Sequence, residues 1–318
     1  MVLTDTADKI KSMEIRGAGR IARAAALALS EHAGSIESTD IASFSNEMKR
    51  AADLIAGTRP TAVSLPNAVN IVMASMAQAT TVAEAKMAIG SKAFEFVQSS
   101  KNAVERIGKI GARNIRDGDV VLTHCNSEAA LACLIEARRS GKDFTVFATE
   151  VRPRNQGLLT IRVLNEAGIK TNFIVDSAVR SFINEIDLVI TGADAITVNG
   201  AVVNKIGTSQ IALAAHEART NFIVAAETYK FAPRTILGEQ VEIEERPASE
   251  VLPDEMAKNL PYVTVRNPVF DVTPAEYVDL IITESGAIPP QMAYIIIRDY
   301  LGWDISEFGK EFDIDHHD

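Results

Sequence analysis

The stretch DGDVVLTHCNSEAALACLIEARRSGKDFTVFATE, residues 117–150, decides the fold class of this 318-residue chain. Two short apolar runs, residues 120–123 and 144–148, enclose a segment whose apolar residues recur at helical spacing. Apolar runs that alternate with helices are typical of parallel strands covered on both faces. This stretch therefore predicts a strand–helix–strand unit of an α/β fold.

The same alternation continues toward the C-terminus. Further apolar runs cover residues 172–175, 188–191, 222–225 and 278–283, and the expected helices cover residues 129–140, 159–167, 209–219 and 291–300. Gly141 and Gly168 stand where the C-terminal caps of two of these helices belong. We predict a Rossmann-like domain with a mainly parallel sheet over residues 116–318.

The preceding residues, 1–115, show a different pattern. Apolar residues recur there at helical spacing, as in Ile21, Ala25, Ala28 and Leu29, and β-rich clusters are scarce. We expect an N-terminal helical domain followed by the Rossmann-like domain, so that the fold class as a whole is α/β.

Composition and charge exclude several classes of function. The formal net charge of −10, without a basic run that contains aromatic residues, disfavours a nucleic-acid partner. No apolar run is long enough to span a membrane, and the first residues lack a secretory signal. Two cysteines are too few for a disulfide framework, and no metal-ligand spacing occurs. We therefore expect a cytoplasmic protein without a membrane partner or a metal.

The first candidate functional residue is Cys125. In open α/β sheets, ligands bind beyond the carboxyl ends of the strands, and Cys125 follows the run 120–123 and precedes an expected helix. A thiol at a helix N-terminus ionises more readily, which suits a base or a nucleophile. The alternative is a buried structural thiol. Cys133 lies among apolar residues inside the helix and is assigned to the core, and His124 is expected to be a hydrogen-bonded residue at a strand end.

The second candidate lies in GADAITVNGAVVNKIG, residues 192–207. Asn199-Gly200 between short apolar runs predicts a two-residue hairpin, which would place Asp194 opposite Lys205 with Asn204 beside them. A partly desolvated carboxyl at this edge can hold a proton at neutral pH. The alternative is a structural Asp–Lys pair that closes the hairpin.

Near the N-terminus, GAGRIA (17–22) matches a dinucleotide-binding pattern, which would indicate a nicotinamide-dependent dehydrogenase. That pattern should follow a strand, whereas helical stretches lie on both sides here. The glycine turn, flanked by Arg16 and Arg20, can instead offer N–H groups to a phosphate, or it is a plain turn between helices. Arg59 is either a phosphate ligand or a solvated charge. The same alternatives stay open for Arg152, Arg154 and Gln156.

Several motifs together resemble the family that contains ribose-1,5-bisphosphate isomerases, methylthioribose-1-phosphate isomerases and the regulatory subunits of translation initiation factor 2B. They occur in a fixed order over essentially the whole chain. They are MEIRGAGRIAR (13–23), TRPTAVSLPNA (58–68), THCNSEAA (123–130), TEVRPRNQG (149–157), GADAITVNGAVVNKIGT (192–208), AAETYKF (225–231) and NPVFDVTPAEYVDLIITESGAIPP (267–290).

Within this family the chain looks most like the archaeal ribose-1,5-bisphosphate isomerases. The first glycine motif lacks the proline typical of methylthioribose-1-phosphate isomerases, and Lys230 adds a cation that suits a second phosphate. The regulatory subunits generally lack the pair Cys125 and Asp194. A methylthioribose-1-phosphate isomerase and a non-catalytic regulatory subunit are the alternatives.

The resemblance implies that Cys125 is the base and Asp194 the acid in converting ribose 1,5-bisphosphate to ribulose 1,5-bisphosphate through a phosphoenolate. It implies no metal or redox cofactor, and AMP as an allosteric activator. It further implies homodimers, with a hexameric trimer of dimers as a larger assembly, and a place in archaeal AMP and nucleoside salvage. The implied substrate-binding residues are Arg16, Gly17, Ala18, Gly19, Arg59, Ser127, Gln156, Asn204, Lys205 and Lys230.

Overall fold

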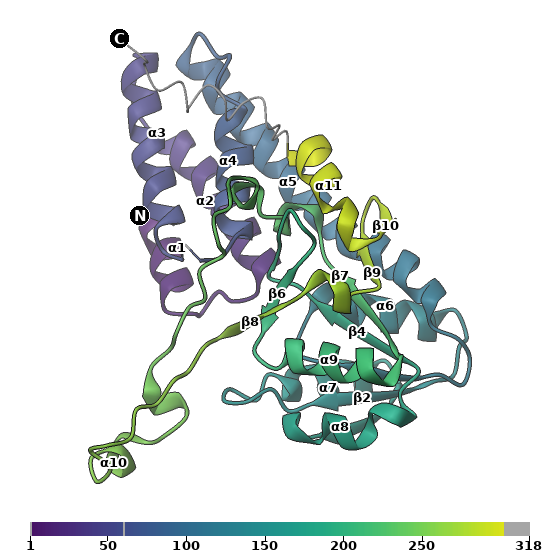
Figure 1. Ribbon diagram of the computed structural model, residues 1–318. Coiled ribbons are helices and arrows are strands. Elements are labelled where there is room, and N and C mark those ends of the chain that lie inside the picture. Colours follow the sequence, from purple (N-terminus) through teal and green to yellow (C-terminus); the bar gives the residue numbers. More distant parts are fainter. Residues whose placement is uncertain (1, 60, 302–318) are drawn as a thin grey trace, which may run out of the picture. The chain divides into compact units, whose positions relative to one another are not determined.

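The computed structural model describes residues 2–59 and 61–301, and the side chains of residues 3–59 and 61–301. The chain forms two compact units that divide between Val104 and Glu105 (Figure 1). Within the described ranges, no helix combines the length and the apolar character needed to cross a membrane.

The first unit is helical, as the sequence predicts. Its helices are α1 (Val2–Lys11), α2 (Ala18–Ser35), α3 (Ile41–Ala56), α4 (Ser64–Ala74) and the first part of α5 (Val82–Gly111). Their apolar stripes meet in a core that includes Leu29, Phe44 and Met48, all fully buried. Asp40 caps α3 because its carboxylate accepts a 2.8 Å hydrogen bond from the amide of Ser43.

The second unit contains a seven-stranded sheet in the order β10-β9-β7-β4-β1-β2-β3. All neighbouring strands in it are parallel except β9 and β10. The prediction of a mainly parallel sheet is therefore confirmed. The strands are β1 (Val120–Thr123), β2 (Thr145–Thr149), β3 (Lys170–Ile174), β4 (Leu188–Gly192), β7 (Asn221–Ala225), β9 (Leu280–Thr283) and β10 (Gly286–Ile288).

Helices cover both faces of this sheet. Val121 of β1 packs on one face with residues of α6 and α7, whereas Leu122 packs on the other face with residues of α8, α9 and α11. Cys133 of α6 is fully buried on the first face, so its assignment to the core is confirmed. The helices are α6 (Glu128–Arg139), α7 (Gly157–Glu166), α8 (Val179–Phe182), α9 (Thr208–Ala218), α10 (Asp254–Ala257) and α11 (Ala293–Leu301).

A smaller antiparallel sheet joins β5 (Ala195–Ile196), β6 (Val202–Lys205) and β8 (Phe270–Thr273). The hairpin of β5 and β6 agrees with the prediction, but the residues of its turn differ from the predicted ones. The amide of Gly200 donates to the carbonyl of Thr197, so Val198 and Asn199 form the centre of the turn, and Gly200 follows with a φ of +81°. The predicted two-residue turn at Asn199-Gly200 is therefore wrong, because the left-handed glycine follows the turn instead of forming its centre.

An arm, residues 239–268, leaves this unit before β8 and carries α10 near its tip (Figure 1). Its two legs are joined at the base, where the amide of Arg246 donates to the carbonyl of Asn267 at 3.0 Å and Val269 donates to Glu244 at 2.9 Å. The strand and helix patterns of the sequence do not predict this arm.

Candidate active site

Cys125 stands where the chain leaves β1 and turns into α6. Its backbone is left-handed, with a φ of +67°, a conformation that is unfavourable for residues other than glycine and is found at functional sites. The thiol Sγ donates to Oε1 of Gln156 at 3.2 Å, and the hydroxyl of Thr160 donates to the carbonyl of Cys125 at 2.9 Å. Ser127 caps α6 by accepting a hydrogen bond from the amide of Ala130. These contacts hold the thiol at the carboxyl edge of the sheet.

The thiol is less acidic than the sequence predicts. Desolvation by the surrounding protein raises the pKa of Cys125 to about 11, although the positive charge of Lys205 acts to lower it. The negative charge of Asp194 raises this pKa further. The helix N-terminus lowers the pKa of Cys125 little. The helix α6 begins only at Glu128, after Cys125, and the dipole acts mainly within the first turn. Cys125 is therefore protonated at neutral pH in this structure.

We expect the alkylation of Cys125 by iodoacetamide to show this high pKa in the unliganded protein. The thiolate is the reactive form, so the rate should rise about tenfold per pH unit from about pH 7 to about pH 10. Rates measured by mass spectrometry of the labelled peptide test this expectation. A plateau reached near pH 8 would contradict it.

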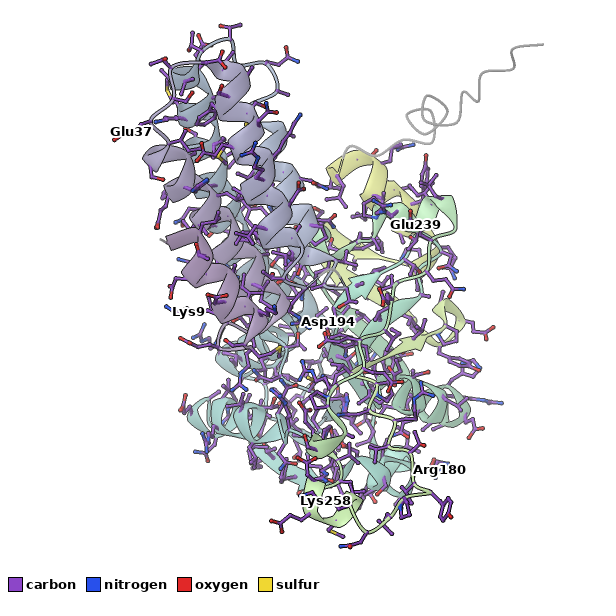
Figure 2. The ribbon with its side chains drawn as sticks, turned by 90° about the vertical axis from the view of Figure 1, so that its left-hand side faces the viewer. Lys9, Glu37, Arg180, Asp194, Glu239 and Lys258 are labelled. Carbon is purple, nitrogen blue, oxygen red and sulfur yellow. The ribbon has the colours of Figure 1, made fainter. Side chains whose placement is uncertain are left out.

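Asp194 lies between β4 and β5. Its amide donates to the carbonyl of Val203 at 2.9 Å, so Asp194 lies beside Val203 and Asn204, not opposite Lys205 as predicted. The register differs because the hairpin turn has a longer loop than the predicted one. The charge of Asp194 nonetheless affects the pKa of both Cys125 and Lys230, which places the carboxyl near both groups. Asp194 of the sheet unit is labelled in Figure 2.

The neighbouring strand β6 carries Asn204 and Lys205. Asn204 is buried, and its amide Nδ2 donates to the hydroxyl of Thr208 at 3.0 Å. The Nζ atom of Lys205 lies 4.9 Å from the centre of the Phe270 ring, a cation–π distance. Since β6 pairs with β8 on its other side, Phe270 fixes the direction of the lysine whose charge acts on the Cys125 thiol.

Lys230 is buried in an ion pair with Glu227. Its Nζ lies 2.7 Å from Oε2 of Glu227, and the lysine side chain is only 7% exposed. Tyr229 donates from its hydroxyl to the other carboxylate oxygen of Glu227 at 3.0 Å. Burial alone would lower the pKa of Lys230, but Glu227 and Asp194 outweigh it and raise the pKa. Lys230 is thus charged, and Glu227 already balances this charge.

His124 is a hydrogen-bonded residue at a strand end, as predicted. Its Nδ1 lies 2.6 Å from the hydroxyl of Thr149, and its Nε2 lies 3.0 Å from the carbonyl of Ile206. Burial lowers the pKa of the ring, and the neighbouring Asp176 only partly opposes this shift. The neutral imidazole therefore donates to Ile206 and accepts from Thr149.

Asp271 of β8 is a residue of this site that sequence patterns do not reveal. Its Oδ2 accepts hydrogen bonds from the amides of Gly207 at 2.7 Å and Ser209 at 3.0 Å, at the N-terminus of α9. Burial raises the pKa of Asp271 to about 6, against the lowering effect of these hydrogen bonds and of Lys205. The short strand β8 has no periodic signal that could have placed this carboxyl beside Gly207.

The raised pKa predicts a pH-dependent effect of the substitution Asp271→Asn. The folded protein holds this proton up to about pH 6, whereas the unfolded chain releases it near pH 4. The native state binds more protons in this window, so the wild-type free energy of unfolding falls as pH rises, by up to about 3 kcal/mol from this group. The asparagine variant lacks this loss. Its stability relative to wild type should therefore rise from pH 4 to pH 7 in urea titrations, and a difference independent of pH would contradict the prediction.

The remaining predicted residues belong to the helical unit. Arg16, Gly17, Ala18 and Gly19 form the entry to α2, where Gly17 has a φ of +92° that a residue with a side chain rarely adopts. Arg59 follows the end of α3. The structure thus brings Cys125, Ser127, Gln156, Asp194, Asn204, Lys205 and Lys230 into the sheet unit. Among the described residues, no group of three or more His, Cys, Asp and Glu side chains could hold a metal ion.

A helical unit followed by a mainly parallel α/β sheet with a thiol and a carboxyl at its carboxyl edge defines the class: a two-unit Rossmann-like protein with a candidate acid–base site. The model of the initiation factor 2 subunit family matches residues 14–290. The chain belongs to this family.

The relatives indicate which branch of the family is most similar. The ribose 1,5-bisphosphate isomerase of Methanocaldococcus jannaschii is 54% identical over 302 residues, covering 95% of this chain and 96% of that protein. The protein of the same name from Archaeoglobus fulgidus is 55% identical, covering 94% and 93%. A methylthioribose-1-phosphate isomerase from Acetivibrio thermocellus is 37% identical, covering 90% and 88%. The solved structure of an initiation factor eIF-2B from Pyrococcus horikoshii matches with a TM-score of 0.78 at 33% identity, covering 91% and 97%.

Proposed function

We propose that this protein is an aldose–ketose isomerase that converts ribose 1,5-bisphosphate into ribulose 1,5-bisphosphate. The observation that carries the proposal is the electrostatic coupling of a positioned thiol, Cys125, to the carboxyl of Asp194 and the ammonium of Lys205. Relatives at 54% and 55% identity that bear this name support it, whereas a methylthioribose-phosphate isomerase is 37% identical.

The chemistry needs an acid to open the sugar ring and a base to move a proton from C2 to C1. Asp194, when protonated, would donate to the ring oxygen. Cys125, as thiolate, would remove the C2 proton and leave a phosphoenolate, whose developing charge Lys205 would stabilise. Proton return at C1 gives the ketose. Gln156 accepts the hydrogen bond of the resting thiol and would orient the sulfur.

The high resting pKa of Cys125 is compatible with this role because the charge of Asp194 contributes to it. The negative charge of Asp194 raises the pKa of the thiol, so moving a proton onto Asp194 removes this effect. The reactive pair of thiolate and carboxylic acid has the same net charge as the resting pair of thiol and carboxylate. The site can therefore reach its reactive form by an internal proton shift, without losing a proton to solvent.

The wider context completes the proposal. The enzyme would work in the cytoplasm as a homodimer, with a hexamer as the larger assembly, and would need no metal or redox cofactor. AMP would activate it, and its product would belong to AMP and nucleoside salvage. Arg16 to Gly19 and Arg59 of the helical unit would bind substrate together with Ser127, Asn204, Lys205 and Lys230.

An assay with two substrates tests the proposed reaction. The purified protein is incubated with ribose 1,5-bisphosphate or with methylthioribose 1-phosphate, each with and without AMP, and the ketose product is followed. We expect turnover of the bisphosphate, increased by AMP, and little or none of the monophosphate. Preference for methylthioribose 1-phosphate would assign the protein to the other enzymatic branch, and turnover of neither substrate would refute the proposal.

A further inference from the structure

The loop after β2, residues 151–156, brings Gln156 to the thiol of Cys125. This loop is closed at its base, because the amide of Gly157 donates to the carbonyl of Glu150 at 3.1 Å. A short loop with joined ends has few conformations. The backbone angles inside it therefore decide where Gln156 lies relative to the sulfur.

Val151, the first residue of this loop, has a strained backbone. Its φ of +64° lies in the left-handed region, which is a genuine outlier for a β-branched residue. Its side chain is buried, with only 1% exposed. Asn155 is also left-handed, with a φ of +50°, but asparagine tolerates this conformation well. A strained residue such as Val151 persists only where its surroundings hold it, and such residues cluster at functional sites.

The carboxylate of Asp176 holds this strained backbone. Its Oδ1 accepts a hydrogen bond from the amide of Val151 at 2.9 Å, and its Oδ2 accepts one from the amide of Arg152 at 2.8 Å. The backbone pairing of β2 and β3 ends one residue earlier, where the amide of Glu150 donates to the carbonyl of Ile174 at 2.9 Å. The side chain of Asp176 thus continues the pairing at the point where the chain turns out of the sheet. Hydrogen bonds to a carboxylate are stronger than those to a neutral acceptor.

We propose that Asp176 is a positioning residue of the candidate active site. It holds Val151 in the left-handed conformation, and the closed loop then sets Gln156 against the thiol of Cys125. The inference rests on the proposed function, in which Gln156 orients the sulfur. His124 is the other group that faces this carboxylate, but its Nδ1 lies 3.9 Å from Oδ1, so the two backbone amides are the closer partners.

The substitution Asp176→Asn tests this role. The amide side chain has one acceptor oxygen, and its NH2 group would face one of the two backbone amides as a second donor. We expect kcat with ribose 1,5-bisphosphate to fall about 10- to 100-fold, with a smaller change in KM, because a small displacement of a positioned group is costly. The matched control is Asp187→Asn, since Asp187 also accepts from a backbone amide, that of Val120 at 2.9 Å, at the opposite edge of the sheet. This control should retain kcat, and an unchanged kcat in Asp176→Asn would overturn the proposal.

A second substitution separates the effect on the backbone from the effect of the charge. Glycine adopts the left-handed conformation without strain, so Val151→Gly should make the hydrogen bonds of Asp176 less necessary. In this background, Asp176→Asn should lower kcat by less than about threefold relative to Val151→Gly alone. Urea titrations give the folded fraction of each variant, since glycine also removes a buried side chain. An equal loss of kcat in both backgrounds would show that the carboxylate acts through its charge, and the positioning role would be wrong.

Alkylation of Cys125 by iodoacetamide tests the same role without isomerase activity. The hydrogen bond to Gln156 favours the protonated thiol, and the negative charge of Asp176 raises the pKa of Cys125. Asp176→Asn should therefore speed alkylation at pH 8 at least about fivefold, but less than about twofold in the Val151→Gly background, where only the charge effect remains.

The two measurements distinguish a failure of the inference from a failure of the proposed function. A wild-type protein that does not convert ribose 1,5-bisphosphate, but whose variants show these alkylation rates, would refute the proposed function and support the positioning role. Isomerase activity, with kcat and alkylation both unaffected by Asp176→Asn, would do the reverse.

Discussion

Replacement of Cys125 by serine is expected to lower turnover by a factor on the order of 10³ or more, while the fold stays intact. A serine hydroxyl is a far weaker acid than a thiol, so the internal proton shift toward Asp194 becomes unfavourable. The hydroxyl can still donate to Oε1 of Gln156, as the thiol does at 3.2 Å. The substitution therefore removes the base and retains the local hydrogen bond.

A matched control for this prediction is Cys133→Ala. Cys133 is fully buried in the core under the sheet, and burial raises the pKa of its thiol to about 12. Its removal should cost about 1 kcal/mol of stability and leave turnover per folded molecule close to wild type. The measurements are kcat with ribose 1,5-bisphosphate and urea titrations of all three proteins. A Cys125→Ser variant that turns over at nearly the wild-type rate would remove this residue from the mechanism.

The parallel sheet could be predicted from sequence because each of its central strands is a local signal. A strand such as β1, Val120–Thr123, is buried on both faces because helices cover both. Its consecutive residues are therefore apolar, and this run is visible in the sequence. The arm and β8 could not be predicted in this way. Asp271 is joined to Gly207 by a contact between distant segments, and no periodicity within either segment encodes it.

The candidate site shows the same division between local and long-range information. The positions of Cys125 and Asp194 at strand ends follow from the order of elements, since parallel strands present their carboxyl ends at one edge. The ionisation of Cys125 does not follow, because desolvation by the folded unit outweighs the local effect of the helix N-terminus. The motif after β2 places Gln156 at this edge of the sheet. The sequence does not show that Gln156 contacts the thiol of Cys125 there.

Replacement of Asp194 by asparagine is expected to lower turnover on a similar scale, on the order of 10³. Asparagine has nearly the same shape but cannot supply a proton to the ring oxygen. A matched control is Asp279→Asn. The wild-type carboxylate of Asp279 accepts a 2.7 Å hydrogen bond from the amide of Phe222 near the start of β7, at the edge of the sheet opposite to Asp194. This control should retain turnover.

The variant Asp194→Asn is expected to have a second effect, on the reactivity of Cys125, which a merely structural carboxyl would not produce. Because the charge of Asp194 raises the pKa of Cys125, its removal should lower that pKa and speed alkylation of the thiol at pH 8 relative to wild type. Asp194→Asn should thus make Cys125 more reactive toward iodoacetamide while making the enzyme less active. Unchanged alkylation would show that the two groups are not coupled, and the internal proton shift would then lose its physical basis.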